Sequence, residues 1–245
     1  MSVSNSFRLG SPDLFPPAER HVYLDAASVG LSHKGGAAAI SRWQNALAEQ
    51  GTIAFDEQAE VECLDKLNAA AAGLFNATPD DIAIASSETD VSRALQKLNP
   101  GILGWRSHKD MWDFQPDRLE LPDSAKRYEF GTMAYGTAYG ATESVRHILE
   151  TGVDRIAAHN RKISDHLIDG LKALGAEVLG PKDSADRSAT VAARFPGRNS
   201  REFARTLKQA NVIASLRRDF IRFSPHYYNN IDDIDQGLAA IKAAL

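Results

Sequence analysis

The sequence predicts a mixed α/β chain with two parts of different character. From about residue 140 onward, helical and strand patterns alternate regularly, which is typical of an α+β domain with strands on one side and helices on the other. Before that, residues 82–90 look like a buried strand that runs into a helix start, yet no series of βαβ units follows. We therefore expect an α/β pattern that breaks off over residues 1–134 and an α+β domain over residues 135–245.

The first part of the chain contains an arm, short strands and two helices. Three prolines predict an extended arm over residues 1–20, because proline breaks helices. Residues 22–24 are expected to form a short strand that leads into a turn of small residues. Two helices are predicted at about residues 34–50 and 58–75, and Asn76 is expected to end the second one. Residues 82–85 predict a short buried strand.

The second part has a clearer pattern of elements. A long helix is expected over residues 138–174, with Gly152 as the point where it breaks. Asn199 or Ser200 is expected to cap a helix that runs to residue 209. The other expected elements are strands at 175–179 and 190–195, paired strands at 212–216 and 220–223, and a closing helix at 231–245.

The bulk composition excludes several classes of protein. With 43% hydrophobic and 24% charged residues, the 245-residue chain has an ordinary globular composition. Its net charge of −4 gives no indication of a nucleic-acid or anionic-membrane partner. Cys63 is the single cysteine and cannot form an internal disulfide, which fits a reducing compartment. Because residues 1–17 lack an apolar signal core and no stretch approaches the roughly 18 apolar residues of a membrane span, we expect a cytoplasmic protein.

Two segments carry side chains that suit an anion. Ser86 and Ser87 stand where a strand ends and a helix starts, so hydroxyls and free backbone N–H groups meet there. A plain helix cap without a ligand explains these two residues equally well. Arg222 alternates with apolar residues along its predicted strand and so points away from their face. Its guanidinium suits a carboxylate, and the alternative is a structural ion pair with the acidic run after Asn230.

Four segments together resemble one known family. They are Tyr-Leu-Asp-Ala-Ala-Ser at residues 23–28, Ile-Ala-Ser-Ser-Glu-Thr-Asp at 84–90, Tyr-Glu-Phe-Gly-Thr at 128–132, and Ile-Arg-Phe-Ser-Pro-His-Tyr-Tyr-Asn-Asn at 221–230 with Asp-Asp-Ile-Asp at 232–235. Each segment is weak by itself, but their order across nearly the whole chain is similar to the class V aminotransferase-like, fold-type I family. This family depends on pyridoxal phosphate (PLP) and includes cysteine desulfurases, kynureninases and isopenicillin-N epimerase-like proteins.

The resemblance implies a role for five residues. It places Ala27 in the turn beside the substrate and Arg222 on the substrate carboxylate. It places Ser86 and Ser87 on the cofactor phosphate, and Thr132 in a segment that reaches the phosphate of the partner subunit. Without the resemblance, Thr132 would be interpreted as an ordinary turn residue.

The chain departs from the family in its middle. Family members have a long segment that supplies a residue stacked on the PLP ring, an aspartate for the ring nitrogen and the Schiff-base lysine. Here Asp90 runs directly into Val91, and the octet that starts at Val91 resembles family sequence from beyond the lysine, so the junction is expected near residues 90 and 91. None of the ten lysines lies in a small-residue turn between strands. We therefore expect a truncated fold-type I architecture, in which the N-terminal part is a remnant of the large α/β domain. We assign no catalytic residue and no metal ligand in this chain.

These observations predict a member of a PLP-dependent family that acts on amino acids by transaminase, lyase or epimerase chemistry, with this chain itself inactive. The alternative is a non-catalytic dimeric binding module derived from the same fold. A hydrolase is disfavoured because the Gly-x-Ser-x-Gly motif is missing from the sequence. The desulfurase subtype is in doubt, since residues 211–219 contain no cysteine for a persulfide.

A homodimer is expected for two reasons. The resemblance gives Thr132 a role in the neighbouring subunit. In addition, loss of the central βαβ units would leave strands 22–24 and 82–85 without parallel partners, and buried strands need them. The aromatic segment 105–114 could supply apolar surface for a second chain. The alternative is a rearranged monomer in which helices 34–50 and 58–75 cover the two strands.

Overall fold

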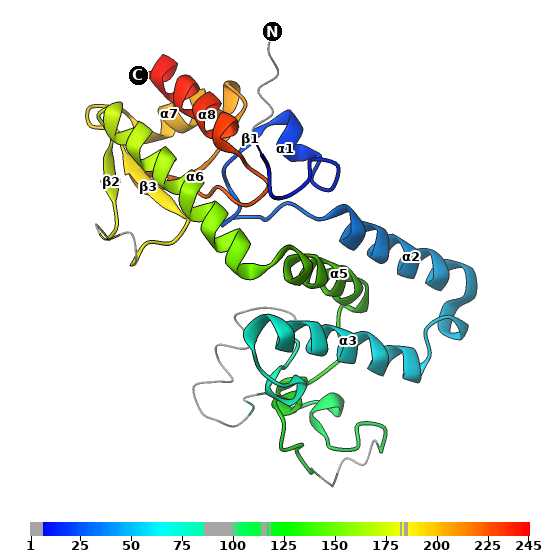
Figure 1. Cartoon of the computed structure of the whole chain (residues 1–245). Coiled ribbons are helices and arrows are strands. Elements are labelled where there is room, and N and C mark those ends of the chain that lie inside the picture. The colour runs from blue at the N-terminus through cyan, green and yellow to red at the C-terminus, as the bar shows by residue number, and fades with distance from the viewer. Residues whose placement is uncertain are drawn as a thin grey trace. The chain divides into compact units, whose positions relative to one another are not determined.

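The computed structural model describes residues 7–85, 100, 102–113, 117, 119–181, 183 and 186–245 (Figure 1). The chain divides into two compact units. The sheet unit comprises residues 1–34 and 151–245, and the helical unit comprises residues 35–150. The boundary that the sequence suggests between residues 134 and 135, as the start of an independently folding domain, stays a prediction.

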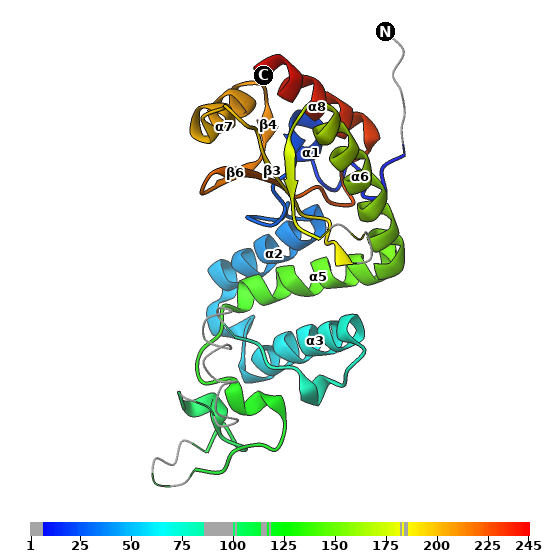
Figure 2. The same ribbon diagram turned by 90° about the vertical axis from the view of Figure 1, so that its left-hand side faces the viewer.

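A four-stranded antiparallel sheet forms the centre of the sheet unit. Its strand order is β2 (Glu177–Leu179), β3 (Val191–Arg194), β6 (Phe220–Phe223) and β5 (Ser215–Arg217). The longer helices described in the same unit are α6 (Val153–Ala173), α7 (Ser200–Gln209) and α8 (Ile231–Ala244). Helices α6 and α8 pack against each other, as the second view shows (Figure 2).

Strand register separates the two faces of this sheet. Val191, Ala193, Ile221 and Phe223 are buried at 2% exposure or less, and they share one core with residues of α6, α7 and α8. Because side chains alternate along a strand, Arg222 lies on the opposite face. The predicted alternation around Arg222 is therefore confirmed.

The strand near the N-terminus has a partner within the chain. Strand β1 (Val22–Tyr23) pairs in parallel with β4 (Val212–Ile213), and an isolated parallel bridge joins Asp25 to Ser224 further on. Leu24 is fully buried in the same core as the sheet. The expectation that loss of the central units leaves residues 22–24 without parallel partners is therefore wrong, because the Val22 N–H donates to the Asn211 carbonyl and the Leu24 N–H donates to the Ile213 carbonyl.

The longer helices described in the helical unit are α2 (Lys34–Gln50), α3 (Glu57–Phe75) and α5 (Tyr135–Thr151). Short 3-10 turns lie at residues 51–53, 79–81, 105–107 and 125–128. The core of this unit includes Cys63, Leu64, Leu67, Tyr135 and Ala138. Helices α2 and α5 approach closely at Gly36, where a Cβ atom would come within 2.8 Å of the Gly140 carbonyl oxygen, so a side chain at this position would force the helices apart.

Three predicted elements differ from the structure. The strand expected at 212–216 is split into β4, which pairs with β1, and β5, which pairs with β6. Residues 82–85 form no strand; instead the Ile84 N–H donates to the Glu129 carboxylate at 3.0 Å, which satisfies part of that backbone without a sheet. The arm over residues 1–20 contains the short helix α1 (Pro17–Arg20), because proline is well suited to the first helical position. The expected ends are confirmed at Asn76, which is left-handed with φ 53°, and at Gly152, where φ is 93° and separates α5 from α6.

Candidate functional site

The turn after β1 and the β5–β6 hairpin bring five polar residues together. Ser215 and Arg222 are direct cross-strand partners in the hairpin, so both side chains lie on the outer face of the sheet. Arg217 lies two residues beyond Ser215 on the same strand and shares this face. The parallel bridge between Asp25 and Ser224 places Asp25 and the following turn, which contains Ser28, beside them. We call Asp25, Ser28, Ser215, Arg217 and Arg222 the arginine network.

Hydrogen bonds join all five members of the arginine network. Nη2 of Arg222 donates to Ser28 Oγ and lies 3.4 Å from Asp25 Oδ1. Nη2 of Arg217 donates to the same Ser28 Oγ at 3.0 Å. Ser215 Oγ lies 2.8 Å from Ser28 Oγ, and 2.7 and 2.8 Å from the two carboxylate oxygens of Asp25. Two guanidinium groups therefore meet at one hydroxyl oxygen.

The direction of each hydroxyl hydrogen follows from this geometry. A serine hydroxyl has two acceptor lone pairs and one donor hydrogen. Both lone pairs of Ser28 Oγ are used by the two guanidinium N–H groups, so its hydrogen donates to Ser215 Oγ. The Ser215 hydrogen then donates to the Asp25 carboxylate. The network is thus a directed chain from two cations to one anion.

Arg222 retains hydrogen-bonding capacity within this network. Its side chain is 19% exposed and that of Asp25 is 15% exposed, so the pair is largely removed from water. Nε of Arg222 is buried and has no hydrogen-bond partner. The alternative of an ion pair with the acidic run after Asn230 is wrong, since Arg222 pairs with Asp25, whereas Asp233 pairs with Arg8 at 2.6 Å.

Of the other predicted site residues, Ala27 lies beside the arginine network: it is exposed in the same turn, directly before Ser28. Thr132 is exposed and lies in the helical unit, three residues before α5 begins. Ser86, Ser87 and the junction at residues 90 and 91 lie outside the described residues.

Sequence reasoning missed the contribution of Ser28, Ser215 and Arg217. The predicted pairing of strands 212–216 and 220–223 offered a signal for Ser215, whose parity places it on the Arg222 side once the hairpin register is known. Arg217 shares this parity but lies just beyond the predicted strand. No local pattern indicated Ser28, because its contact with the hairpin spans 187 residues of sequence.

A comparison with family models decides the family. The model described as Aminotransferase class-V matches residues 91–236, which is more than half of the chain. The chain belongs to the aminotransferase class-V family. Its curated relatives include an uncharacterized aminotransferase of Schizosaccharomyces pombe, 30% identical over 120 residues, which are 49% of this chain and 30% of that protein. A probable cysteine desulfurase of Ureaplasma parvum is 27% identical over 177 residues, or 67% of this chain and 42% of that protein. The matched part of the class-V chain thus spans less than half the length of these relatives.

Solved structures show the same fold. A lysine-to-alanine mutant of C-DES, with glycine covalently linked to its PLP cofactor, aligns with a TM-score of 0.77 at 13% identity over 95% of this chain and 99% of that one. The cysteine desulfurase CsdA of Escherichia coli aligns with a TM-score of 0.71 at 12% identity over 95% of this chain and 96% of that one. The class-V chain therefore has a fold-type I architecture.

The described residues do not fit PLP as a covalently held cofactor. A Schiff-base lysine must be held in a protected position to act as a nucleophile. Lys126 is half-buried and its Nζ pairs with Asp65 at 2.8 Å. The other described lysines are exposed: Lys34, Lys66, Lys109, Lys162, Lys172, Lys208 and Lys242. Lys97 and Lys182 lie outside the described residues.

Other reactive chemistry finds little support in the part of the chain that the structure describes. Burial raises the pKa of the Cys63 thiol to about 11, so this sulfur stays protonated near neutral pH. Within the described residues, no group of three or more His, Cys, Asp and Glu side chains is arranged to hold a metal ion. None of the described helices combines the length and apolar character needed to span a membrane.

Proposed function

We propose that this class-V chain binds an amino acid through its α-carboxylate at Arg222 and does not carry out PLP chemistry. The arginine network carries this proposal. Its largely buried guanidinium is held by Asp25 and Ser28, and its buried Nε has no partner. Such a group is suited to a planar carboxylate, which accepts two parallel N–H bonds.

Family membership supports the class of ligand. PLP enzymes of this family act on amino acids, and the C-DES structure contains glycine linked to PLP. Binding of the carboxylate next to Ala27 would retain that part of the family's function. We also propose that Ser86, Ser87 and Thr132 bind a phosphate group. A cytoplasmic location is likewise a proposal. The alternative of a non-catalytic dimeric module that binds a protein or a small anion in place of an amino acid stays a prediction.

We expect no stable internal aldimine when the protein is mixed with PLP. The described lysines are exposed or paired, so any Schiff base there would form weakly and at several positions. The measurement is borohydride reduction followed by intact mass and peptide mapping. The urea-unfolded chain, treated in parallel, gives the level of non-specific labelling. A stoichiometric adduct on a single lysine, Lys97 and Lys182 included, would contradict the proposal.

We also expect a two-fold homodimer. Ile102 and Leu103 are 55% and 46% exposed just before the aromatic segment 105–114, and exposed apolar side chains of this kind favour association. Size exclusion with light scattering should give twice the mass of one chain. A double substitution of Ile102 and Leu103 by serine should shift the species toward monomer, with Phe75→Ser, another exposed apolar position, as the control. A monomer mass at all concentrations would refute the dimer.

A further inference from the structure

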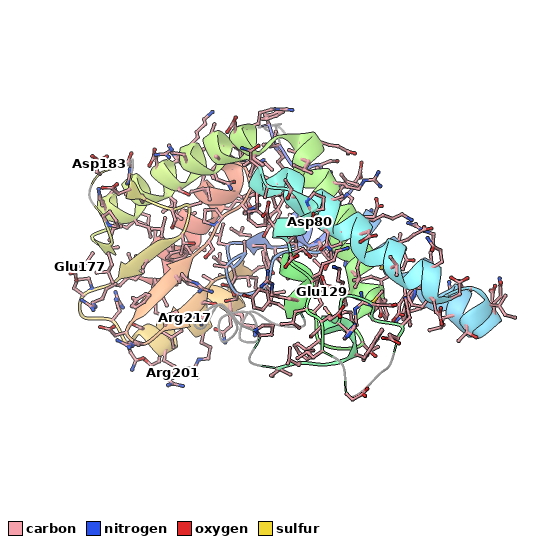
Figure 3. All side chains as sticks on the ribbon, turned by 90° about the horizontal axis from the view of Figure 1, so that it is seen from below. Asp80, Glu129, Glu177, Asp183, Arg201 and Arg217 are labelled. Carbon is pink, nitrogen blue, oxygen red and sulfur yellow. The ribbon has the colours of Figure 1, made fainter. Side chains whose placement is uncertain are left out.

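Arg217 has no role in the proposed carboxylate site so far, yet the structure holds it in place there. Its Nη1 donates to the Leu216 carbonyl oxygen and its Nη2 donates to Ser28 Oγ, both at 3.0 Å. The side chain is exposed, and an exposed arginine normally gains little from adopting a single conformation. In Figure 3, Arg217 and Arg201 are both labelled on the sheet unit.

The arginine network carries an excess of positive charge. It contains the cations Arg217 and Arg222 and the single anion Asp25, so its net charge is +1. Asp219, in the turn of the same hairpin, does not offset this charge, because its carboxylate pairs with Arg194 at 2.7 Å. The present acceptor shared by the two guanidinium groups is the neutral hydroxyl of Ser28.

The net charge of the arginine network would favour acidic amino acids over neutral ones. A neutral amino acid is a zwitterion of net charge zero and leaves the network at +1. An acidic amino acid has net charge −1 near pH 7 and neutralises the network. Its second carboxylate would also replace the Ser28 hydroxyl as acceptor for Arg217, and a hydrogen bond between two ionised groups is about twice as strong as one between neutral groups.

We propose that Arg217 is a specificity-determining residue, and that the site prefers acidic amino acids over neutral amino acids of the same size. In this arrangement Arg222 binds the α-carboxylate and Arg217 binds the side-chain carboxylate. The inference rests on the proposed function, because it requires that Arg222 binds the α-carboxylate.

The test is calorimetric titration with L-glutamate against L-glutamine, and with L-aspartate against L-asparagine. We expect wild-type protein to bind each acid about tenfold more tightly than its amide. Arg217→Gln should remove this preference by weakening the acids about tenfold, while the affinity for the amides stays the same. Arg201→Gln, a change at an exposed arginine on α7 outside the network, should preserve the preference.

The outcomes separate the two proposals. Equal affinity of wild-type protein for acid and amide, with both lost in Arg222→Lys, would overturn the role of Arg217 and leave the carboxylate site standing. Equal weakening of acid and amide by Arg217→Gln would also overturn it. Failure of all four amino acids to bind would overturn the proposed function itself and the inference with it. A thermal melt of each variant shows that the protein is folded when it is titrated.

Discussion

Replacing Glu129 with glutamine should destabilise the helical unit by about 3–5 kcal/mol, because the change leaves a buried cation without its counter-ion. Nη2 of Arg106 lies 3.6 Å from Glu129 Oε2, and both side chains are about 5% exposed or less. The other carboxylate oxygen accepts the Ile84 N–H. Glu129 is labelled in Figure 3.

The expected destabilisation comes more from the desolvation of Arg106 than from the loss of its attraction to Glu129. Burial raises the pKa of Glu129 on balance, even though the Ile84 N–H and the Arg106 and Lys126 charges act in the opposite direction. The ion pair therefore gains little over two neutral groups, but an Arg106 without its counter-ion has lost its hydration and keeps neutral partners such as the Tyr135 hydroxyl, 3.5 Å from Nη1. Replacing both partners, as Glu129→Gln with Arg106→Met, should cost clearly less than the sum of the two single changes.

Urea denaturation measures these free energies. The matched control is Glu143→Gln, which removes the acid of an exposed pair whose Arg146 Nη1 to Glu143 Oε1 distance is 3.4 Å. This control should change the free energy of unfolding by less than about 1 kcal/mol. A similarly small effect of Glu129→Gln would show that Arg106 reaches water and that the pair is not structural.

Acidification should destabilise the sheet unit through His226. Burial, with repulsion from His159 as a smaller cause, lowers the pKa of His226 to about 4. Its ring packs against Tyr227 and Tyr228 at centroid distances of 4.8 and 5.5 Å, and its Nδ1 is buried without a hydrogen-bond partner. The folded state therefore favours the neutral ring.

The direction of this pH effect on stability follows from the number of protons that each state binds. In the unfolded chain His226 has its ordinary pKa near 6.5, so between about pH 6.5 and 4 the unfolded state binds more protons than the folded state. The stability contributed by neutral His226 is fully present above about pH 6.5 and is lost as the pH falls through 4, with a total of about 3 kcal/mol.

The measurement is the free energy of unfolding at pH 7 and at pH 4, for wild type and for His226→Phe. The variant should lose about 3 kcal/mol less than wild type over this interval, because phenylalanine does not titrate. His166→Gln is the control, since His166 is an exposed histidine whose Nε2 pairs with Asp235 at 2.6 Å. Equal acid sensitivity in wild type and His226→Phe would show that the ring of His226 is hydrated in the folded protein.

Local signals explain which elements were predictable. Asn199 accepts the N–H groups of Arg201 and Glu202, and Gly152 breaks the long helix, so both boundaries could be read from neighbouring residues. The pairing of β1 with β4 could not be predicted in this way, because parallel pairing between distant segments leaves no local sequence pattern. Residues 82–85 have the composition of a strand, but a strand forms only where a partner supplies hydrogen bonds.

In the candidate site, too, some features have a local sequence signal and others do not. Arg222 was predictable from alternation and from the family signature, whereas its surroundings depend on register. Ser28 reaches the hairpin only because residues 22–25 align with residues 212–213 and 224, and the sequence contains no separate signal of that alignment. The meeting of Arg217 and Arg222 at one hydroxyl therefore required three-dimensional information.

The parallel pairing of β1 with β4 also determines the order in which the protein can fold during synthesis. Asp25 and Ser215, which hydrogen-bond in the finished sheet unit, are separated by 190 residues. At a synthesis rate of roughly 5–20 residues per second, the first strand leaves the ribosome about 10–40 s before its partner. During this interval the apolar side chains of Val22 and Leu24 lack the core that later covers them. The helical unit lies entirely between the two strands in sequence, so its residues are available to fold first. Chaperones that shield short apolar segments are therefore expected to act on the first residues of this chain.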